Sequence, residues 1–133
     1  MTSLVALLST GKGTWNRVVQ IIEKEDWKQI ILVTNEFGKE RFTERFGTKE
    51  NSQLIVVDLR KPAEELVKEI YEKICDKLKG LEVAVNISSG TGQEHMALIS
   101  ALIQTGVGIR FVDIVDEKVQ EICVPDMHAL EEY

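Results

Sequence analysis

The sequence predicts an α/β fold in which helices cover both faces of a mostly parallel sheet. Apolar runs with little polar alternation, such as LVALL at 4–8 and QIILVT at 29–34, are typical of strands buried on both faces. These runs alternate along the chain with segments of helical periodicity, which is the order that a parallel sheet requires. No linker or low-complexity segment interrupts the pattern, so we expect a single domain over residues 1–133.

The individual elements follow from these patterns in chain order. Apolar, often β-branched runs predict strands at 3–9, 29–34, 53–59, 82–87 and 108–114. Apolar residues three and four positions apart predict helices at 14–25, 36–47, 62–80 and 93–106. The sequence VDEK at 115–118 predicts a turn that leads into a returning hairpin strand at 119–124. Residues 125–133 are expected to form a short helix or a loose end.

The third helix has the clearest boundary signals. It has Pro62 in its first turn and Gly80 at its end, the usual places for these residues. Its inward face is expected to comprise Leu66, Ile70, Ile74 and Leu78.

The order of the strands follows from handedness. Because crossovers between parallel strands are right-handed, few arrangements remain. We expect a Rossmann-like sheet of order 3-2-1-4-5, with the C-terminal strand antiparallel at the edge. The first and fourth strands are then neighbours, and the winding reverses between them. Such a switch point opens a crevice for ligands at the carboxyl ends of the strands.

Two similar turns leave these two strands, STGKGT at 9–14 and SSGTGQ at 88–93. Their glycines let the backbone approach a ligand closely, and their Ser and Thr hydroxyls add hydrogen-bond donors. Each turn also leads into a helix N-terminus with unpaired amides. Side by side, the two turns predict a site for phosphates or a similar anionic group.

Neither turn is a known nucleotide fingerprint. Asn16 and His95 stand where the third glycine of G-x-G-x-x-G belongs, and GKGT is not a P-loop. No acidic residue clearly ends the second strand, where Thr34 and Asn35 stand. Ordinary NAD binding is therefore disfavoured.

Single polar residues near the turns have two readings each. Lys12 is either a solvated lysine or a point-charge clamp on an anion. His95 is either a partly buried polar residue or a ligand contact and general acid. Asn35 either caps the next helix or recognises a base or a ribose, and Phe37 would stack on a base.

Composition excludes several classes of function. The net charge of −6 argues against a surface that grips long nucleic acid. No apolar stretch is long enough to span a membrane, and the N-terminus lacks the features of a signal peptide. Cys75 and Cys123 lack metal-binding spacing and are expected to be buried, reduced thiols of a cytoplasmic protein. No cluster of ligands suggests a metal, and no cofactor is expected.

The fourth predicted helix is apolar nearly all round. From Met96 to Ile103 every residue except Ser100 is apolar, whereas a helix on a sheet needs only one apolar stripe. Its outer side needs a cover, either the C-terminal tail or a second copy of the chain. We favour a twofold homodimer, which would bring both crevices close to the symmetry axis.

The segment from Asn86 through SSGTGQEHMALISALIQTGVGIRFVDI resembles the strand-turn-helix-strand unit of CARF domains, the CRISPR-associated Rossmann-fold sensors. LLSTGKGTW at 7–15 resembles their other ligand loop. The chain departs from the family in carrying Gln93, Glu94 and His95 where a Lys or Arg is common, and in showing no attached effector domain.

The resemblance implies a homodimer that binds a cyclic oligoadenylate across its twofold axis. By position, the ring would contact Ser9, Thr10, Gly11, Lys12, Gly13 and Thr14, and also Ser88, Ser89, Gly90, Thr91, Gly92 and Gln93. Asn35, Glu36 and Phe37 would line the adenine end.

Some stand-alone members of this family are ring nucleases, which cut the messenger and end the antiviral signal. The cleavage needs no metal: the ribose 2′-hydroxyl attacks the adjacent phosphorus and leaves a 2′,3′-cyclic phosphate. Thr10 or Ser9 would position the hydroxyl, Lys12 would stabilise the developing charge, and His95 would protonate the leaving oxygen. Two alternatives stay open, a non-catalytic sensor or sequestering module for the ring, and a Rossmann-like domain for another nucleotide or small phosphate ester.

Overall fold

The protein is described by a computed structural model that covers residues 2–9, 14–78 and 80–122. Within these residues one sheet has the order β3-β2-β1-β4-β5-β6. The parallel strands are β1 (Ser3–Leu7), β2 (Gln29–Thr34), β3 (Ser52–Val56), β4 (Glu82–Asn86) and β5 (Gly108–Val115). Strand β6 (Lys118–Glu121) pairs antiparallel with β5 at the edge. The predicted strand order and the antiparallel edge are confirmed.

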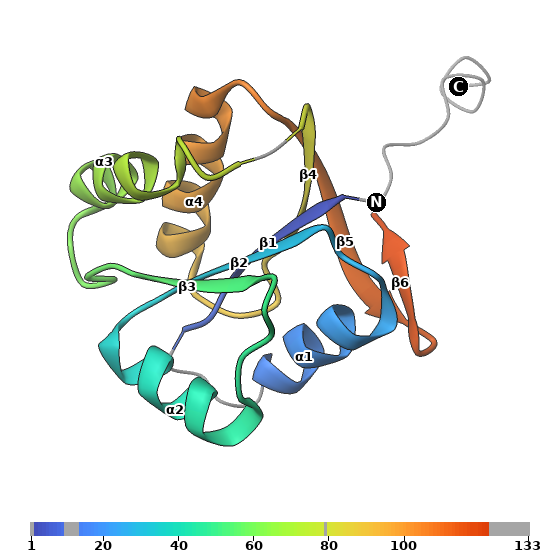
Figure 1. Ribbon diagram of the computed structural model, residues 1–133. Coiled ribbons are helices and arrows are strands. Elements are labelled where there is room, and N and C mark those ends of the chain that lie inside the picture. The colour runs from blue at the N-terminus through green and yellow to red at the C-terminus, as the bar shows by residue number, and fades with distance from the viewer. Residues whose placement is uncertain (1, 10–13, 79, 123–133) are drawn as a thin grey trace, which may run out of the picture.

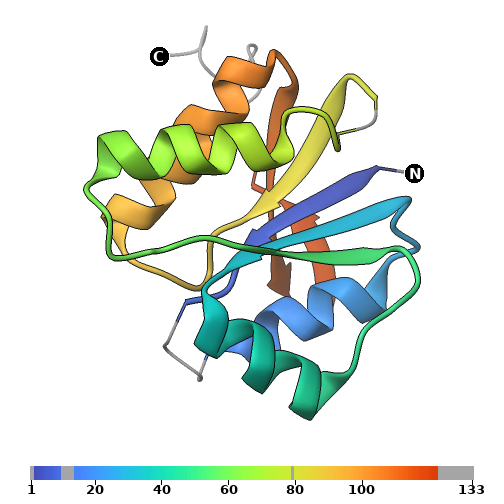
Figure 2. The same ribbon diagram turned by 60° about the vertical axis from the view of Figure 1, so that its left-hand side comes forward.

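Helices cover both faces of the sheet, as predicted. Helices α1 (Trp15–Lys24) and α2 (Glu36–Phe46) lie on one face, and α3 (Ala63–Ile74) and α4 (Gly92–Thr105) lie on the other (Figures 1 and 2). This Rossmann-like arrangement places the loops after β1 and β4 at one rim of the sheet, where the winding reverses.

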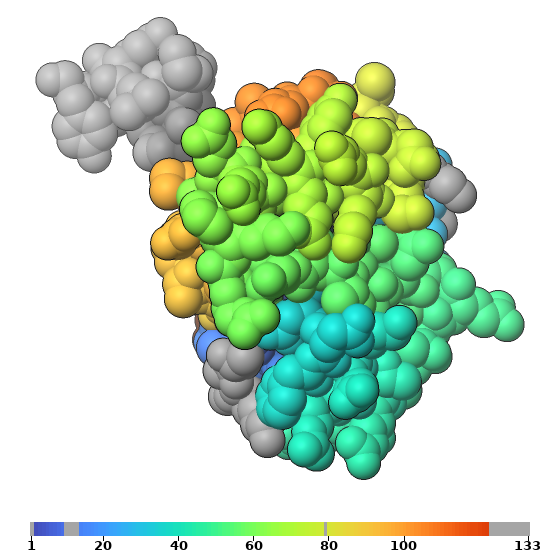
Figure 3. Space-filling view, turned by 90° about the vertical axis from the view of Figure 1, so that its left-hand side faces the viewer, coloured from blue at the N-terminus to red at the C-terminus, as the bar shows by residue number. Residues whose placement is uncertain are grey.

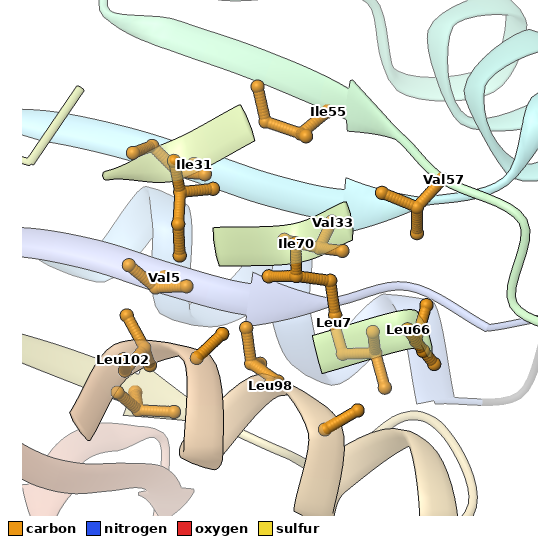
Figure 4. Close-up of a cluster of buried hydrophobic side chains, with 14 of the residues drawn as sticks. Val5, Leu7, Ile31, Val33, Ile55, Val57, Leu66, Ile70, Leu98 and Leu102 are labelled. Atoms are coloured by element: carbon orange, nitrogen blue, oxygen red, sulfur yellow. The ribbon is translucent and has the colours of Figure 1, made fainter. Parts of the chain in front are cut away.

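The strands bury both of their faces, which explains their continuous apolar sequences. In β1, Val5 and Leu7 face α3 and α4, whereas Leu4 and Ala6 face α1 and α2. Figure 4 shows the first of these two layers, in which Leu98 of α4 packs beside β1. The fully buried Val and Leu side chains among these each stabilise the fold by about 1.5–3 kcal/mol. The sheet is therefore a rigid base for the loops at its rim.

Several predicted boundaries differ from the structure. The predicted third helix is too long: α3 ends at Ile74, six residues before Gly80, because Cys75–Lys77 form a turn closed by the Lys77 N–H on the Ile74 carbonyl. Strand β3 ends at Val56 rather than at 59. The predicted hairpin turn is confirmed, with Asp116 and Glu117 at positive φ. The prediction that Cys75 is buried is wrong, because Cys75 is exposed in the turn that follows α3. The tail at 125–133 and Cys123 lie outside the described residues.

Among the described residues, no helix combines the length and apolar character needed to cross a membrane.

Candidate functional site

The two glycine-containing turns begin side by side at the switch point. Strands β1 and β4 are neighbours, with Ala6 opposite Asn86. Just beyond the strand ends, the backbone N–H of Ser9 donates a buried hydrogen bond of 2.9 Å to the hydroxyl oxygen of Ser89. The structure therefore joins the described ends of the two turns directly.

The first turn leaves the sheet in a fixed position. The N–H of Leu8 donates to the carbonyl of Val33, and the Thr34 hydroxyl donates to the carbonyl of Leu8. The indole of Trp15 donates to the carbonyl of Ser9 at 2.7 Å, which anchors the turn from α1. The next four predicted site residues lie outside the described residues: Thr10, Gly11, Lys12 and Gly13. Thr14 follows them as the N-cap residue of α1.

In the second turn, residues predicted to contact a ligand have structural roles. Ser89 is completely buried and Ser9 nearly so, and the Ser89 hydroxyl accepts from the backbone N–H of Ser9, so the two residues tie the turns together instead of lining an open surface. Gly90 has a φ of +109°, and a Cβ there would lie 2.3 Å from Cδ2 of Leu7. Packing against β1 therefore requires this glycine. Gly92 differs, because a Cβ there would meet nothing within 4 Å.

The N-terminus of α4 is already partly satisfied by the chain itself. The Thr91 hydroxyl accepts a hydrogen bond from the N–H of Glu94, and the Glu94 carboxylate accepts one from the N–H of Thr91. This capping box places a buried carboxylate at the helix N-terminus that was predicted to face phosphate. Among the described residues, the N–H groups of Gly92 and Gln93 have no hydrogen-bond acceptor, so they are the donors available to a ligand.

His95 is held by one of its two ring nitrogens. Its Nε2 lies 2.8 Å from the carbonyl oxygen of Ser89. A carbonyl only accepts hydrogen bonds, so Nε2 carries the proton and donates. The role of general acid predicted for His95 is therefore left to Nδ1, which requires the imidazolium form. In the neutral form Nδ1 is instead an acceptor.

A network of polar side chains on β4, β5 and α1 holds the second turn in place. The Ser88 hydroxyl donates to Oδ1 of Asp113 on β5, and Arg17 of α1 donates to Oδ2 at 2.9 Å. Partial burial raises the pKa of Asp113, but the hydrogen bond from Arg17 heads the opposing effects, and the net pKa lies below the ordinary 3.8. Asn86 at the end of β4 donates to Ser88 and to the carbonyl of Val112. This network fixes Ser88 as a part of the scaffold.

Sequence reasoning missed Arg17 and Asp113. The acidic residue near the end of the run GIRFVDI was a signal, because β5 adjoins the switch-point strand β4. Its partner could not be found in the sequence, since Arg17 is 96 positions away.

The other predicted contacts lie one strand further along the same rim. Asn35 caps α2, with its side-chain oxygen accepting from the N–H of Gly38 at 2.8 Å. Asn35, Glu36 and Phe37 form one wall of a hollow of about 510 Å³ at the ends of β2 and β3. Its other wall contains four charged residues of the β3–α3 side: Asp58, Arg60, Glu69 and Lys73. None of these four was predicted as a site residue.

The charges of this second wall are largely paired, either with one another or with the neighbouring Lys61. The Lys61 ammonium donates to the Glu69 carboxylate, and Arg60 pairs with Asp58 at 3.2 Å. Burial raises the pKa of Glu69, but the hydrogen bond from Lys61 leads the effects that lower it overall. The pKa of Asp58 is lowered chiefly by the backbone N–H of Arg60. The carboxylates therefore stay ionised near neutral pH.

The described residues contain no group of three or more His, Cys, Asp or Glu side chains arranged to hold a metal ion. Together, the fold and the site define a Rossmann-like α/β protein with two joined turns at its switch point and a charged hollow beside them. No protein-family model matches the chain, and no curated protein matches it.

Proposed function

We propose that this protein binds a cyclic oligoadenylate at the switch point of its sheet, and that two copies of the chain share one ring. The observation that carries the proposal is the hydrogen bond between Ser9 and Ser89, because it brings two helix-leading turns to one place. Helix N-termini attract phosphates through unpaired amides and the helix dipole. One such turn is common in proteins, whereas a joined pair suits a ligand with several phosphates.

The groups that would bind the phosphates are fewer than the sequence suggested. Gly92 and Gln93 are the first two residues of α4, and both are exposed, so their backbone N–H groups can donate to a phosphate. Lys12 is the one lysine within the two turns, and its charge would offset the capping carboxylate of Glu94. The geometry suggests a ligand with phosphates, and the resemblance of both turns to CARF ligand loops suggests that this ligand is a cyclic oligoadenylate.

The surface of α4 supports the homodimer. Met96 is 57% exposed and Ile103 is 63% exposed, and Ile99 between them is partly exposed. These three residues are spaced by three and four positions and so lie along one stripe of the helix. The stripe starts one turn after Gly92, so pairing two copies through it would bring their candidate sites near a common axis. A twofold axis matches the symmetry of a cyclic oligonucleotide.

Cleavage of the ring is the second candidate function, and the position of His95 favours it. Its Nε2 is fixed on the Ser89 carbonyl. This bond orients the imidazole of His95 and leaves Nδ1 for proton transfer. In the reaction the ribose 2′-oxygen forms a bond to the adjacent phosphorus, and the bond to the 5′-oxygen breaks. The hydroxyl proton passes to solvent, and the imidazolium of His95 gives a proton to the leaving oxygen. The product is a linear oligoadenylate that ends in a 2′,3′-cyclic phosphate.

A cytoplasmic location is part of this proposal. It fits the free and exposed thiol of Cys75, because exposed thiols stay reduced in that compartment.

The test is to incubate the purified protein with radiolabelled cyclic tetra-adenylate and hexa-adenylate in EDTA. Retention of an intact ring supports binding alone, and linear products support cleavage. Lys12→Ala should weaken binding at least ten-fold, whereas Lys28→Ala, at the amino end of β2, should not. Failure of both rings to bind at micromolar concentration would refute the proposal and favour another nucleotide or phosphate ester.

A further inference from the structure

The carboxylate of Glu94 is a buried charge that the capping box of α4 explains only in part. Glu94 is 8% exposed, and its Oε1 accepts a hydrogen bond of 2.9 Å from the N–H of Thr91. A glutamine forms the same box without a charge. Burying a carboxylate is costly unless the charge is paired, and the box itself does not require one. The negative charge of Glu94 therefore points to a further role.

The second carboxylate oxygen, Oε2 of Glu94, is available at the surface. Among the described residues no donor bonds to it, since the bond from Thr91 goes to Oε1. In the same part of the chain, every side-chain nitrogen or oxygen that is shielded from solvent has a hydrogen-bond partner. Because Oε2 has no partner there, it must reach solvent. Figure 3 shows part of α4 (orange) at the surface beside α3 (green).

The carboxylate of Glu94 and the imidazole of His95 both lie against Gly90. A Cβ placed on Gly90 would be 3.1 Å from Oε1 of Glu94 and 3.1 Å from Nε2 of His95. These two atoms are already held, Oε1 by the N–H of Thr91 and Nε2 by the carbonyl of Ser89. The atoms left for a ligand are Oε2 and Nδ1. A fixed proton acceptor thus lies next to a group that, as imidazolium, is a proton donor.

We propose that Glu94 is the general base of ring cleavage and takes the proton of the ribose 2′-hydroxyl. The inference rests on the function proposed above, in its cleavage form. The 2′-oxygen bonds to phosphorus as its proton moves to Oε2 of Glu94. The bond from phosphorus to the 5′-oxygen breaks as the proton on Nδ1 of His95 moves to that oxygen. Glu94 then releases its proton to solvent and His95 takes one up, which restores both groups.

The charge of Glu94 gives this role a signature in binding. A carboxylate at the start of α4 repels the phosphates of a bound ring, so it opposes binding while it assists cleavage. Its removal should therefore leave ring binding unchanged or make it tighter, and should slow cleavage. A residue that acts only through the fold would weaken both.

The test is single-turnover cleavage of radiolabelled cyclic tetra-adenylate and hexa-adenylate by the full-length protein. Glu94→Gln keeps the capping box and should leave thermal unfolding little changed. Its cleavage rate should fall by about 10²-fold or more, whereas its affinity for the ring should not fall. Glu64→Gln is the matched control, because it makes the same change at an exposed position in the first turn of α3 and should keep the rate.

The pH profile separates a base from a residue that only supports the fold. Between pH 4 and 8 the rate of the unmodified protein should decline at the low end, where Glu94 is protonated, and at the high end, where His95 loses its proton. Glu94→Gln should lose the decline at the low end alone, and Glu94→Asp, which keeps a carboxylate, should retain it. Asp113, whose pKa lies below 3.8, titrates below this range.

Three results would overturn this inference and leave ring binding intact. They are an unchanged cleavage rate in Glu94→Gln, a decline at low pH that persists in that variant, and a ring that the unmodified protein binds without cleaving. Failure of the unmodified protein to bind either ring would refute the function proposed above as well.

Discussion

The backbone N–H of Ser9 donates a 2.9 Å hydrogen bond to the hydroxyl of Ser89, although 80 positions separate the two residues. Both are buried, and the bond lies where the loops after β1 and β4 leave the sheet. The serines that were expected to contact a ligand therefore hold the two turns together. Their effect on any ligand is indirect, through the position of the turns.

Ser89→Ala should destabilise the protein. The substitution leaves the buried N–H of Ser9 without an acceptor, which costs about 1–3 kcal/mol. Urea unfolding measures this loss, and Ser100→Ala, a partly exposed position of α4, is the control. An unfolding free energy within about 0.5 kcal/mol of the unmodified protein would mean that the contact does not tie the turns.

Gly90→Ala and Gly92→Ala should differ sharply in stability. Alanine at 90 would carry a positive φ and a Cβ 2.3 Å from Leu7, which should cost about 2 kcal/mol or more. Alanine at 92 meets open space in the first turn of α4 and should be neutral or slightly stabilising. Thermal unfolding of both variants checks the difference. Equal effects would show that Gly90 is not fixed by its packing on β1.

His95→Gln should separate the structural and chemical roles of His95 if the ring is cleaved. The glutamine amide can still donate to the Ser89 carbonyl, so the fold should be retained. The nitrogen that corresponds to Nδ1 is lost, and the single-turnover cleavage rate should fall by about 10²-fold or more. Binding of the ring should change little. An unaltered cleavage rate would remove His95 from the mechanism.

Met96→Glu combined with Ile103→Glu should produce a monomer. Both side chains are more than half exposed on one stripe of α4, and charges there would oppose pairing of two copies. Light scattering should give the monomer mass of 15.0 kDa for the variant and twice that mass for the unmodified protein. Leu81→Glu, at an 88% exposed position outside α4, should stay dimeric. A 15.0 kDa mass for the unmodified protein would contradict the shared ligand site.

The stability that Asp113 contributes to the folded protein should be lost in acid. Its pKa is lower in the folded state than the ordinary 3.8, so the unfolded state binds more protons at acid pH. The contribution of Asp113 is thus complete above pH 3.8 and is lost as the pH falls through the folded pKa. Because Arg17 and Asp113 are partly exposed, we expect about 1 kcal/mol or less.

The unfolding free energy should be measured from pH 2 to 7. At acid pH it should fall less steeply with decreasing pH in Asp113→Asn than in the unmodified protein; this part of the curve is the acid limb. Asp26→Asn, an exposed position beyond α1, should leave the limb unchanged. Identical limbs in all three proteins would mean that the Asp113 network makes no contribution that depends on protonation.

Part of the candidate site was predictable because its signals are local. The residues TGQE at 91–94 match the capping-box pattern, so the closure of the α4 N-terminus by Glu94 could have been inferred. Asn35 was recognised as a possible helix cap, and it is one. The hollow could not have been predicted, because it depends on side chains of the β3–α3 side reaching residues of the β2–α2 side.

The sequence alone determined the α/β class, the strand order and the adjacency of the two turns. Apolar runs buried on both faces and right-handed crossovers leave few other arrangements, and both act through the backbone. Only the tertiary structure decided which polar side chains of the turns are used internally. Ser89 bonds to Ser9, and Ser88 bonds to Asp113, because partners distant in sequence are set by how the strands and helices pack. The sequence therefore specified where a site could form, and the packing specified which groups remain available to a ligand.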